Sequence, residues 1–325
     1  MRASVDPQRL RAALEELPAP RVRSSRPEVM AAVDGMVLDA FTAAGWLAGR
    51  DEFQARNVWA WAPGGRLAVE PADSLVGVNV VAVKEGAVPE AVVVVAHHDT
   101  VPGSGGADDN GSGVVALLEV ARLLGPLRFR RTVVLAAVDH EELGFHGSRR
   151  LVERLSAERP VLGAFVCEML GYASSVPGSQ QLPAGIGTVY RGQVGKVAGR
   201  DHRGDFLAVI YRQSAVGLAT CFAEGLAALA GPSAPILLRA PTDLPLVGPV
   251  LHAAVPFARN FARSDHVSFW DAGLPAVQLT DTADFRNPHY HLPGDLPDTL
   301  DYGYLADVTA ALALAVERLA EPAET

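Results

Sequence analysis

In the middle of the chain, apolar residues fall into alternating blocks of strand-like and helix-like spacing. The valine-rich run Ala91–Ala96 predicts a strand buried on both faces, and Thr132–Val138 and Val161–Cys167 predict two more. Between these runs, apolar positions recur at helical spacing over Asp109–Leu124 and Gly147–Ala157. This alternation predicts a parallel sheet covered by helices.

The pattern on either side extends this architecture. Further helices are predicted at Asp6–Leu17, Arg26–Trp46, Val216–Leu229 and Tyr302–Leu319, and strands at Glu52–Ala60, Val76–Val83, Phe206–Tyr211, Pro235–Arg239 and Leu274–Leu279. Two segments lack such spacing: Ala173–Gly204 is interpreted as a long loop at the rim of a site, and Pro241–Phe257 as a second loop. We expect a three-layer α/β/α sandwich with a mixed, mostly parallel sheet. Residues 1–325 would form one domain, with N-terminal helices and a strand in residues 1–75.

Composition narrows the classes of partner. Of the 325 residues, 49% are hydrophobic, which is enough for a sizeable core. The net charge of -9 argues against a nucleic-acid partner. Cys167 and Cys221 lie in no CxxC pair and are interpreted as buried thiols, with a disulfide as the alternative. Neither a signal peptide nor an apolar run long enough to span a membrane is recognised, so we expect a cytoplasmic protein with no membrane partner.

Polar residues that can bind a metal follow the first buried strand. The run from Val92 reads V-V-V-V-A-H-H-D, and residues two apart in an extended chain share a face. His97 can therefore bind a metal while Asp99 holds its other ring nitrogen, and His98 points the other way. The alternative is a strand end capped by ordinary polar residues.

A second acidic fragment, G-A-D-D-N-G-S-G, opens the following helix. Helix capping accounts for one polar residue there, but not for Asp108, Asp109 and Asn110 together. A carboxylate at this point can bridge two cations, and the flanking glycines allow a close approach of the backbone.

Acids follow the next two strands as well. Of the adjacent pair Glu141 and Glu142, one can bind zinc while the other accepts a proton from water; two solvated acids in a loop are the alternative. Glu168 directly follows Cys167. His291 lies in the loop N-P-H-Y-H-L-P-G-D, with His289 and His266 as rival ligands.

Three consecutive predicted strands thus end in candidate ligands. The carboxyl ends of a parallel sheet are where α/β folds place their sites. Together these fragments indicate two zinc ions and a hydrolytic enzyme.

At this point the chain resembles the co-catalytic di-zinc aminopeptidases, metallopeptidase family 28. The matching motifs lie in residues 76–320 and read A-H-H-D-T, G-A-D-D-N-G-S-G, D-H-E-E-L-G-F-H-G-S, M-L-G-Y, R-S-D-H-V-S-F and H-Y-H-L-P-G-D. The resemblance implies one zinc held by His97, Asp109 and Glu168, and another held by Asp109, Glu142 and His291. It also implies a cis peptide bond between Asp109 and Asn110.

Further roles follow from the same resemblance. Glu141 would be the general base, Asp99 would orient His97, Tyr290 would polarise the substrate carbonyl, and Arg263 would lie near the substrate's amino end. Many relatives have aspartate where this chain has Glu168. Because an acid at this position can also receive the substrate's ammonium group, the departure bears on specificity.

The resemblance therefore implies a zinc-dependent exopeptidase that removes the N-terminal residue of peptides. A one-zinc transferase like the glutaminyl cyclases, a carboxypeptidase and an inactive binding module are the alternatives. Retention of every ligand position and of Glu141 argues against the inactive module. Only Arg263 and Arg286 lie near the ligands in sequence, so a clamp for a C-terminal carboxylate is not obvious. The sequence makes no prediction of the oligomeric state.

Overall fold

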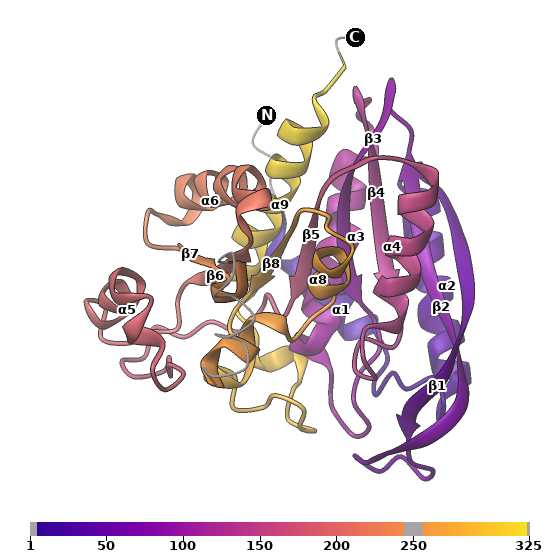
Figure 1. Ribbon diagram of the computed structural model, residues 1–325, viewed down its shortest axis with the longest axis horizontal. Coiled ribbons are helices and arrows are strands. Elements are labelled where there is room, and N and C mark those ends of the chain that lie inside the picture. The colour runs from indigo at the N-terminus through magenta and orange to yellow at the C-terminus, as the bar shows by residue number, and fades with distance from the viewer. Residues whose placement is uncertain (1–4, 244–255, 324–325) are drawn as a thin grey trace.

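The computed structural model describes residues 5–243 and 256–323, and they contain an eight-stranded sheet (Figure 1). The strands are β1 (Leu47–Trp61), β2 (Val69–Lys84), β3 (Val88–His97), β4 (Arg131–Val138), β5 (Val161–Glu168), β6 (Leu207–Tyr211), β7 (Pro235–Arg239) and β8 (Ala276–Thr280). Their order across the sheet is β1-β2-β4-β3-β5-β8-β6-β7. The central strands β4, β3, β5 and β8 are parallel, whereas β1, β2 and β6 each take part in antiparallel pairs. The predicted mixed, mostly parallel sheet is confirmed.

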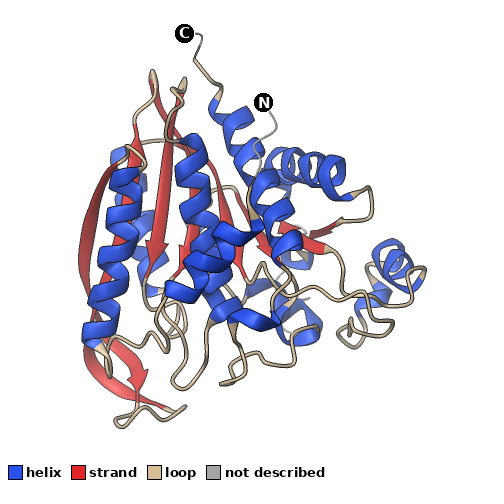
Figure 2. Cartoon of the chain, turned by 180° about the vertical axis from the view of Figure 1, so that it is seen from behind, coloured by secondary structure: helices blue, strands red, loops and turns tan. Residues whose placement is uncertain are grey.

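Helices cover both faces of the sheet (Figures 1 and 2). They are α1 (Pro7–Glu16), α2 (Pro27–Ala43), α3 (Gly113–Leu124), α4 (His146–Glu158), α5 (Arg191–Ala198), α6 (Val216–Ala230), α8 (His266–Asp271) and α9 (Tyr302–Ala320). Strand β3 shows why two layers form: Val92 and Val94 belong to a core shared with residues of α1, α2, α3, α6 and α9, while Val93 and Val95 belong to a second core shared with residues of α4 and α8. Because side chains alternate along a strand, one continuous apolar run supplies both cores.

Register places the carboxyl ends of the central strands side by side. His97, the last residue of β3, pairs with Val138 at the end of β4, and Glu168 at the end of β5 pairs with Thr280 of β8. The loops that follow these strands are therefore brought to one edge of the sheet.

Several element boundaries differ from the prediction. The helix expected over Arg26–Trp46 ends at Ala43, because Gly45 adopts a left-handed φ of 82° and turns the chain into β1. The helix expected from Asp109 begins at Gly113, since Asp109 and Asn110 have non-helical backbone angles. The first two strands are longer than expected and form an extended antiparallel hairpin.

The expected loop Ala173–Gly204 contains a helix, so that prediction was wrong in part. Its glycines and glutamines hide the helical spacing of Val194 and Val197, which line a cavity beneath α5 (Arg191–Ala198). Helix α8 was also missed, because six residues are too few to show a period. Most of the second expected loop, Pro241–Phe257, lies outside the described residues.

One segment, Gln213–Ala230, is long and apolar enough to cross a membrane by length and composition alone. The expectation that no such run exists was therefore wrong on that criterion. In this fold the segment forms α6, whose buried face packs against α9 and the sheet. Within this segment, 33% of the residues are buried inside the fold.

Candidate metal centre

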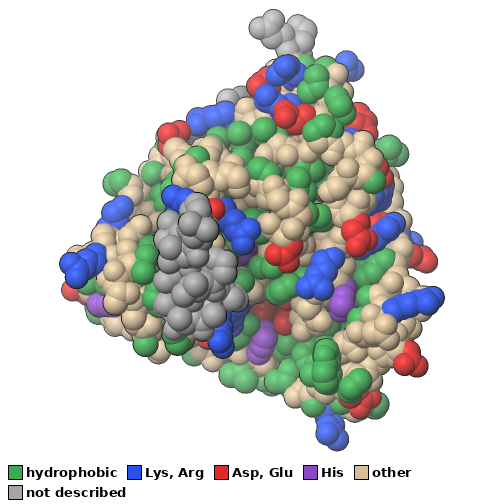
Figure 3. Space-filling model, viewed as in Figure 1, with side chains coloured by type: hydrophobic (Ala, Val, Ile, Leu, Met, Phe, Trp, Pro, Cys, Tyr) green, Lys and Arg blue, Asp and Glu red, His purple; other side chains and the backbone are tan. Residues whose placement is uncertain are grey.

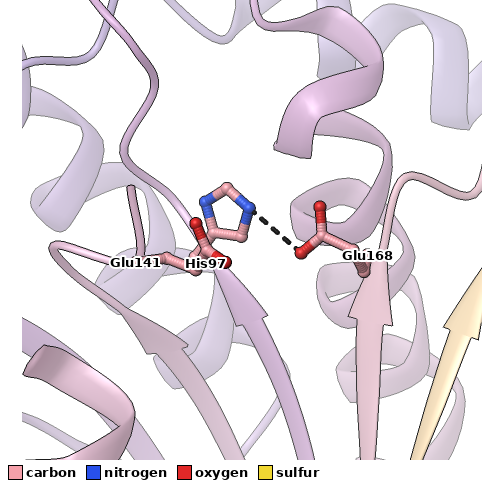
Figure 4. A group of neighbouring side chains, drawn as sticks. All are labelled: His97, Glu141 and Glu168. Carbon is pink, nitrogen blue, oxygen red and sulfur yellow. Dashed lines mark ion pairs between the residues drawn. The ribbon is translucent and has the colours of Figure 1, made fainter. Parts of the chain in front are cut away.

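Side chains from three strand ends converge on His97 (Figure 4). The Nε2 atom of His97 lies 3.3 Å from Oε2 of Glu168 and 3.4 Å from Oδ1 of Asp109. His97, Glu141 and Glu168 also offer ligand atoms that all lie within 4.8 Å of one another. All four side chains are buried.

A second group shares Asp109 with the first. The Nε2 atom of His291 lies 3.1 Å from Oδ2 of Asp109 and 3.4 Å from Oε2 of Glu142. The two carboxylate oxygens of Asp109 thus face different histidines. In the space-filling view, acidic side chains and a histidine are visible in a hollow on this face (Figure 3).

Three of these atoms are buried without a hydrogen-bond partner among the described residues: Nε2 of His97, Oδ1 of Asp109 and Oε1 of Glu142. Leaving such atoms unpaired is costly, so a missing partner is implied. Zinc accepts both nitrogen and carboxylate ligands at about 2.0–2.2 Å, which puts neighbouring ligands of a tetrahedron about 3.3–3.6 Å apart. The observed separations of 3.3 and 3.4 Å in the first group match that spacing. The donor set therefore fits zinc.

The pKa values of the side chains in these two groups reflect the crowding of acids. Burial, together with Glu168 and Glu142, raises the pKa of Glu141 well above its usual value, and burial beside Asp109 raises that of Glu142 to about 7. Burial lowers the pKa of His291, but its bonds to Asp109 and Glu142 outweigh this and bring it to about 10. The raised pKa values show that the buried carboxylates repel one another when charged. A bound cation can reduce this repulsion.

Asp99 lies where the sequence places it, behind His97. Its Oδ1 is 3.5 Å from Nδ1 of His97, and its two oxygens accept hydrogen bonds from the backbone of Glu141 and Glu142 at 3.1 and 3.3 Å. The hydrogen bond from Nδ1 of His97 goes to the backbone carbonyl of Asp99 at 3.2 Å, so Asp99 contacts the ring through its backbone and the loop that carries both glutamates through its carboxylate.

Asp109 is held by a residue that sequence reasoning left without a role. The carboxylate of Asp295 accepts hydrogen bonds from the backbone of Asp108 at 2.9 Å and of Asp109 at 3.0 Å. The Asp109–Asn110 peptide bond is cis, as expected. The side chain of Asn110 bonds to the backbone of Cys167 and Met169. Asp295 lies in the same loop as His291. Its place in that motif was the one feature of the sequence that could have indicated its role.

Asp108 does not reach the ligand groups. Its carboxylate accepts from the backbone of Gly171 and from the side chain of Asn287, both at 2.9 Å. Neither rival histidine belongs to the ligand groups of the described residues: His266 bonds to the carbonyl of Phe261, and His289 lies outside both groups.

Tyr290 and Arg263 border the same hollow. Arg263 contacts the hydroxyl of Tyr290 at 3.2 Å and the carboxylate of Asp284 at 2.8 Å, and the ring of Tyr290 stacks on His291. Burial and the nearby carboxylates Asp109 and Glu142 raise the pKa of Tyr290, so its hydroxyl keeps its proton.

Sequence analysis also missed Asp265. It precedes His266, the rival ligand that lies outside the ligand groups. Both of its carboxylate oxygens are buried without a hydrogen-bond partner in the described part of the chain, and burial raises its pKa to about 7. The motif R-S-D-H contained it, but no spacing rule distinguished it from a helix cap.

Comparison with known proteins identifies a peptidase family. The pattern of Peptidase family M28 matches residues 79–200 and 246–316. The uncharacterized protein YfbL of Escherichia coli (strain K12) is 34% identical over 229 residues, 67% of this chain and 63% of that protein. Aminopeptidase YwaD of Bacillus subtilis (strain 168) is 46% identical over 68 residues, 21% of this chain and 15% of that protein. The chain spans less than two thirds of these relatives' length.

Solved structures share the fold at low identity. An aminopeptidase from Aneurinibacillus sp. strain AM-1 superposes with a TM-score of 0.68 at 16% identity, covering 99% of this chain and 95% of that one. A glutaminyl cyclase from Macrostomum lignano superposes with a TM-score of 0.66 at 17% identity, covering 100% of this chain and 92% of that one. The fold therefore accommodates both activities.

Proposed function

The chain belongs to Peptidase family M28, and from that premise we propose that it is a zinc-dependent aminopeptidase acting on peptides with a free amino end. The observation that carries the proposal is the position of Asp109, whose two oxygens face His97 on one side and His291 on the other. A carboxylate so placed suits a bridge between two zinc ions. Glu168 would complete the first ion's ligands and Glu142 the second's.

When bound, two zinc ions supply Lewis acidity that polarises the scissile carbonyl and lowers the pKa of water. The chain's own residues would do the rest. We assign Glu141 the role of general base, which takes a proton from the attacking water and passes it to the leaving amine. Asp99 would hold the ring of His97, and the hydroxyl of Tyr290 would donate a hydrogen bond to the developing oxyanion.

The charge of the site favours the amino end of a peptide. Glu141 and Glu168 are buried acids that can pair with an ammonium group. The two arginines that could have clamped a C-terminal carboxylate are engaged elsewhere. Arg286 is buried against Gln180 and the carbonyl of Tyr172, and Arg263 holds Asp284 and Tyr290.

The test uses the zinc-loaded chain and three substrates: a dipeptide amide with a free amino group, its acetylated form, and an acetylated peptide with a free carboxyl end. We expect cleavage of the first alone. Cleavage of the third would make the protein a carboxypeptidase. Cyclisation of an N-terminal glutamine with one zinc per chain would instead favour the glutaminyl-cyclase alternative.

Elemental analysis after zinc saturation addresses the ion count, and we expect two equivalents per chain. A ceiling of one would remove the bridging role of Asp109. A cytoplasmic location stays a prediction, which fractionation of the expressing cell can test.

A further inference from the structure

A cavity adjoins the candidate metal centre and shares three residues with it. Glu168, Arg263 and Tyr290 line both the acidic hollow and this cavity, which we call the side-chain cavity. One water molecule needs about 10–15 Å³. On that scale the side-chain cavity offers about 110 Å³, which is room for a bulky side chain.

The wall of the side-chain cavity is mainly apolar and partly aromatic. It is formed by residues of the 182–197 segment, of β6 and β7, and of the turn before α8, among them Leu182, Ile186, Tyr190, Phe206, Ile236 and Phe261. The rings of Tyr190 and Phe261 stack with centroids 5.5 Å apart. Aromatic walls of this kind favour an aromatic guest.

One buried polar side chain on this wall has an oxygen without a hydrogen-bond partner. Gln278 of β8 is 4% exposed, and its Oε1 has no hydrogen-bond partner among the described residues. Of the other amides on the wall, Gln180 bonds to Thr282 and Arg286, and Gln193 donates to the carbonyl of Leu237. The remaining two, Gln181 and Asn260, are not buried. A buried carboxamide oxygen without a partner is costly, which implies a partner that the described residues do not supply.

The position of Gln278 relative to the centre sets the length of that partner. Thr280 pairs in register with Glu168, and Gln278 lies two residues before Thr280 in β8, on the same face and further from the carboxyl edge of the sheet. Two residues of a strand span about 6.6 Å. A substrate whose amino group lies at Glu168 would therefore bring the far end of a long side chain to the carboxamide.

We propose that the side-chain cavity receives the first residue of the peptide and that Gln278 selects tyrosine, whose ring fits the aromatic wall and whose hydroxyl bonds to the carboxamide. This inference rests on the proposed aminopeptidase function. Rotation of the carboxamide exchanges its oxygen and nitrogen, so the hydroxyl can donate to one or accept from the other. Phenylalanine would fill the cavity but leave Gln278 unpaired.

The experiment compares kcat/KM of the zinc-loaded chain for the p-nitroanilides of tyrosine, phenylalanine, leucine, tryptophan and glutamine. We expect tyrosine to exceed phenylalanine roughly tenfold, as one buried hydrogen bond allows. In Gln278→Leu and Gln278→Met, which keep the volume but lose the polar tip, the ratio should fall to about one. Gln193→Leu is the matched control, because that carboxamide is already bonded, and its ratio should stay near wild type.

The experiment gives different results if the proposed role of Gln278 is wrong and if the aminopeptidase proposal is wrong. Cleavage of the panel without a tyrosine preference, a preference for glutamine or tryptophan, or a ratio unchanged in both Gln278 variants would overturn the role of Gln278 alone. If nothing is cleaved, the aminopeptidase proposal fails. In that case, calorimetry compares the binding of L-tyrosinol with that of L-phenylalaninol and tests the tyrosine preference of the side-chain cavity. Equal affinities would overturn the role of Gln278.

Discussion

His97 and His98 are neighbours in the chain, but they lie in opposite environments at the end of β3. The ring of His98 is fully paired: Nδ1 bonds to the carbonyl of Val138 at 2.7 Å and Nε2 to Asp34 at 2.9 Å. The ring of His97 leaves Nε2 unpartnered and facing the acids Asp109 and Glu168. The same residue type thus supports the scaffold on one face and offers a ligand atom on the other.

The difference teaches how to separate structural from functional polar residues in a buried region. Around His98, Arg23 binds Asp34 and Asp139, so each charge has an opposite partner. Around His97, acids outnumber bases, and Nε2 of His97, Oδ1 of Asp109 and Oε1 of Glu142 have no hydrogen-bond partner among the described residues. Burial alone does not distinguish the two faces, but the completeness of the hydrogen bonding does.

The largest expected effect tests the chemistry on the His97 face. Replacing Glu141 with Gln should lower kcat by about 10²–10⁴-fold, because the general base is lost, while zinc content stays near wild type. Glu153→Gln is the control, since Glu153 is an exposed acid on α4. Steady-state kinetics and elemental analysis measure both quantities. Near-normal turnover in Glu141→Gln would assign the proton transfer to another group.

Removal of metal should change stability next most strongly. Chelation would leave the acids of the His97 face unneutralised, and zinc added at about 1,000 times its Kd would restore about 4 kcal/mol of unfolding free energy. Thermal melts of chelated and zinc-loaded protein measure this. Identical melts would mean that the unpaired atoms on this face do not bind zinc.

A paired substitution compares the two histidines directly. His98→Ala should lower the unfolding free energy by about 2–4 kcal/mol, because Asp34 and the carbonyl of Val138 lose a buried partner, with zinc binding retained. His97→Ala should lower zinc content by about one equivalent and change the stability of the chelated protein less. Chemical denaturation with zinc analysis separates the two. The opposite assignment of effects would reverse our interpretation of the two faces.

The smallest expected effect involves a third buried histidine, His266, which lies outside both environments. Burial lowers its pKa to about 4, so the folded protein keeps it neutral. Unfolded chains bind the proton below an ordinary pKa of about 6.5. Its contribution to stability is therefore present at neutral pH and is lost as pH falls from about 6.5 to about 4.

Between pH 7 and pH 5.5 this loss should amount to about 1 kcal/mol. Chelated wild type and His266→Gln, compared by denaturation at both values, isolate the effect because other titrations cancel in the difference. A pH dependence that is the same in both proteins would mean that His266 is protonated in the fold.

Local features of the sequence predicted the sheet and singled out the candidate ligands that the structure brings together at its edge, because both depend on short patterns. The run before His97 specifies a buried strand, and the strand itself places His97 and Asp99 on one face. The family motifs then supplied the partners of Asp109. Helix α5 could not be predicted, because its apolar residues are few and its packing surface comes from β7 and the segment before β6.

The residues that hold the site were harder to predict, since their partners lie far away in sequence. Asp34 meets His98 across 64 positions, and Asp295 meets Asp109 across 186. An isolated aspartate at a helix or turn gives no sign of such a partner. Asp265 gave no signal either, because only the fold buries it and brings it close to the acids Glu168 and Asp99, and both effects raise its pKa.

The long-range contact made by Asp295 also bears on the order in which the protein can mature. A ribosome delivers Asp109 well before Asp295 and His291, so an emerging chain has the first histidine but neither the second nor the carboxylate that fixes the backbone of Asp108 and Asp109. Contacts between such distant segments form late in folding. The candidate centre is therefore completed only when the C-terminal part docks, and the binding of zinc should follow folding of the chain rather than guide it.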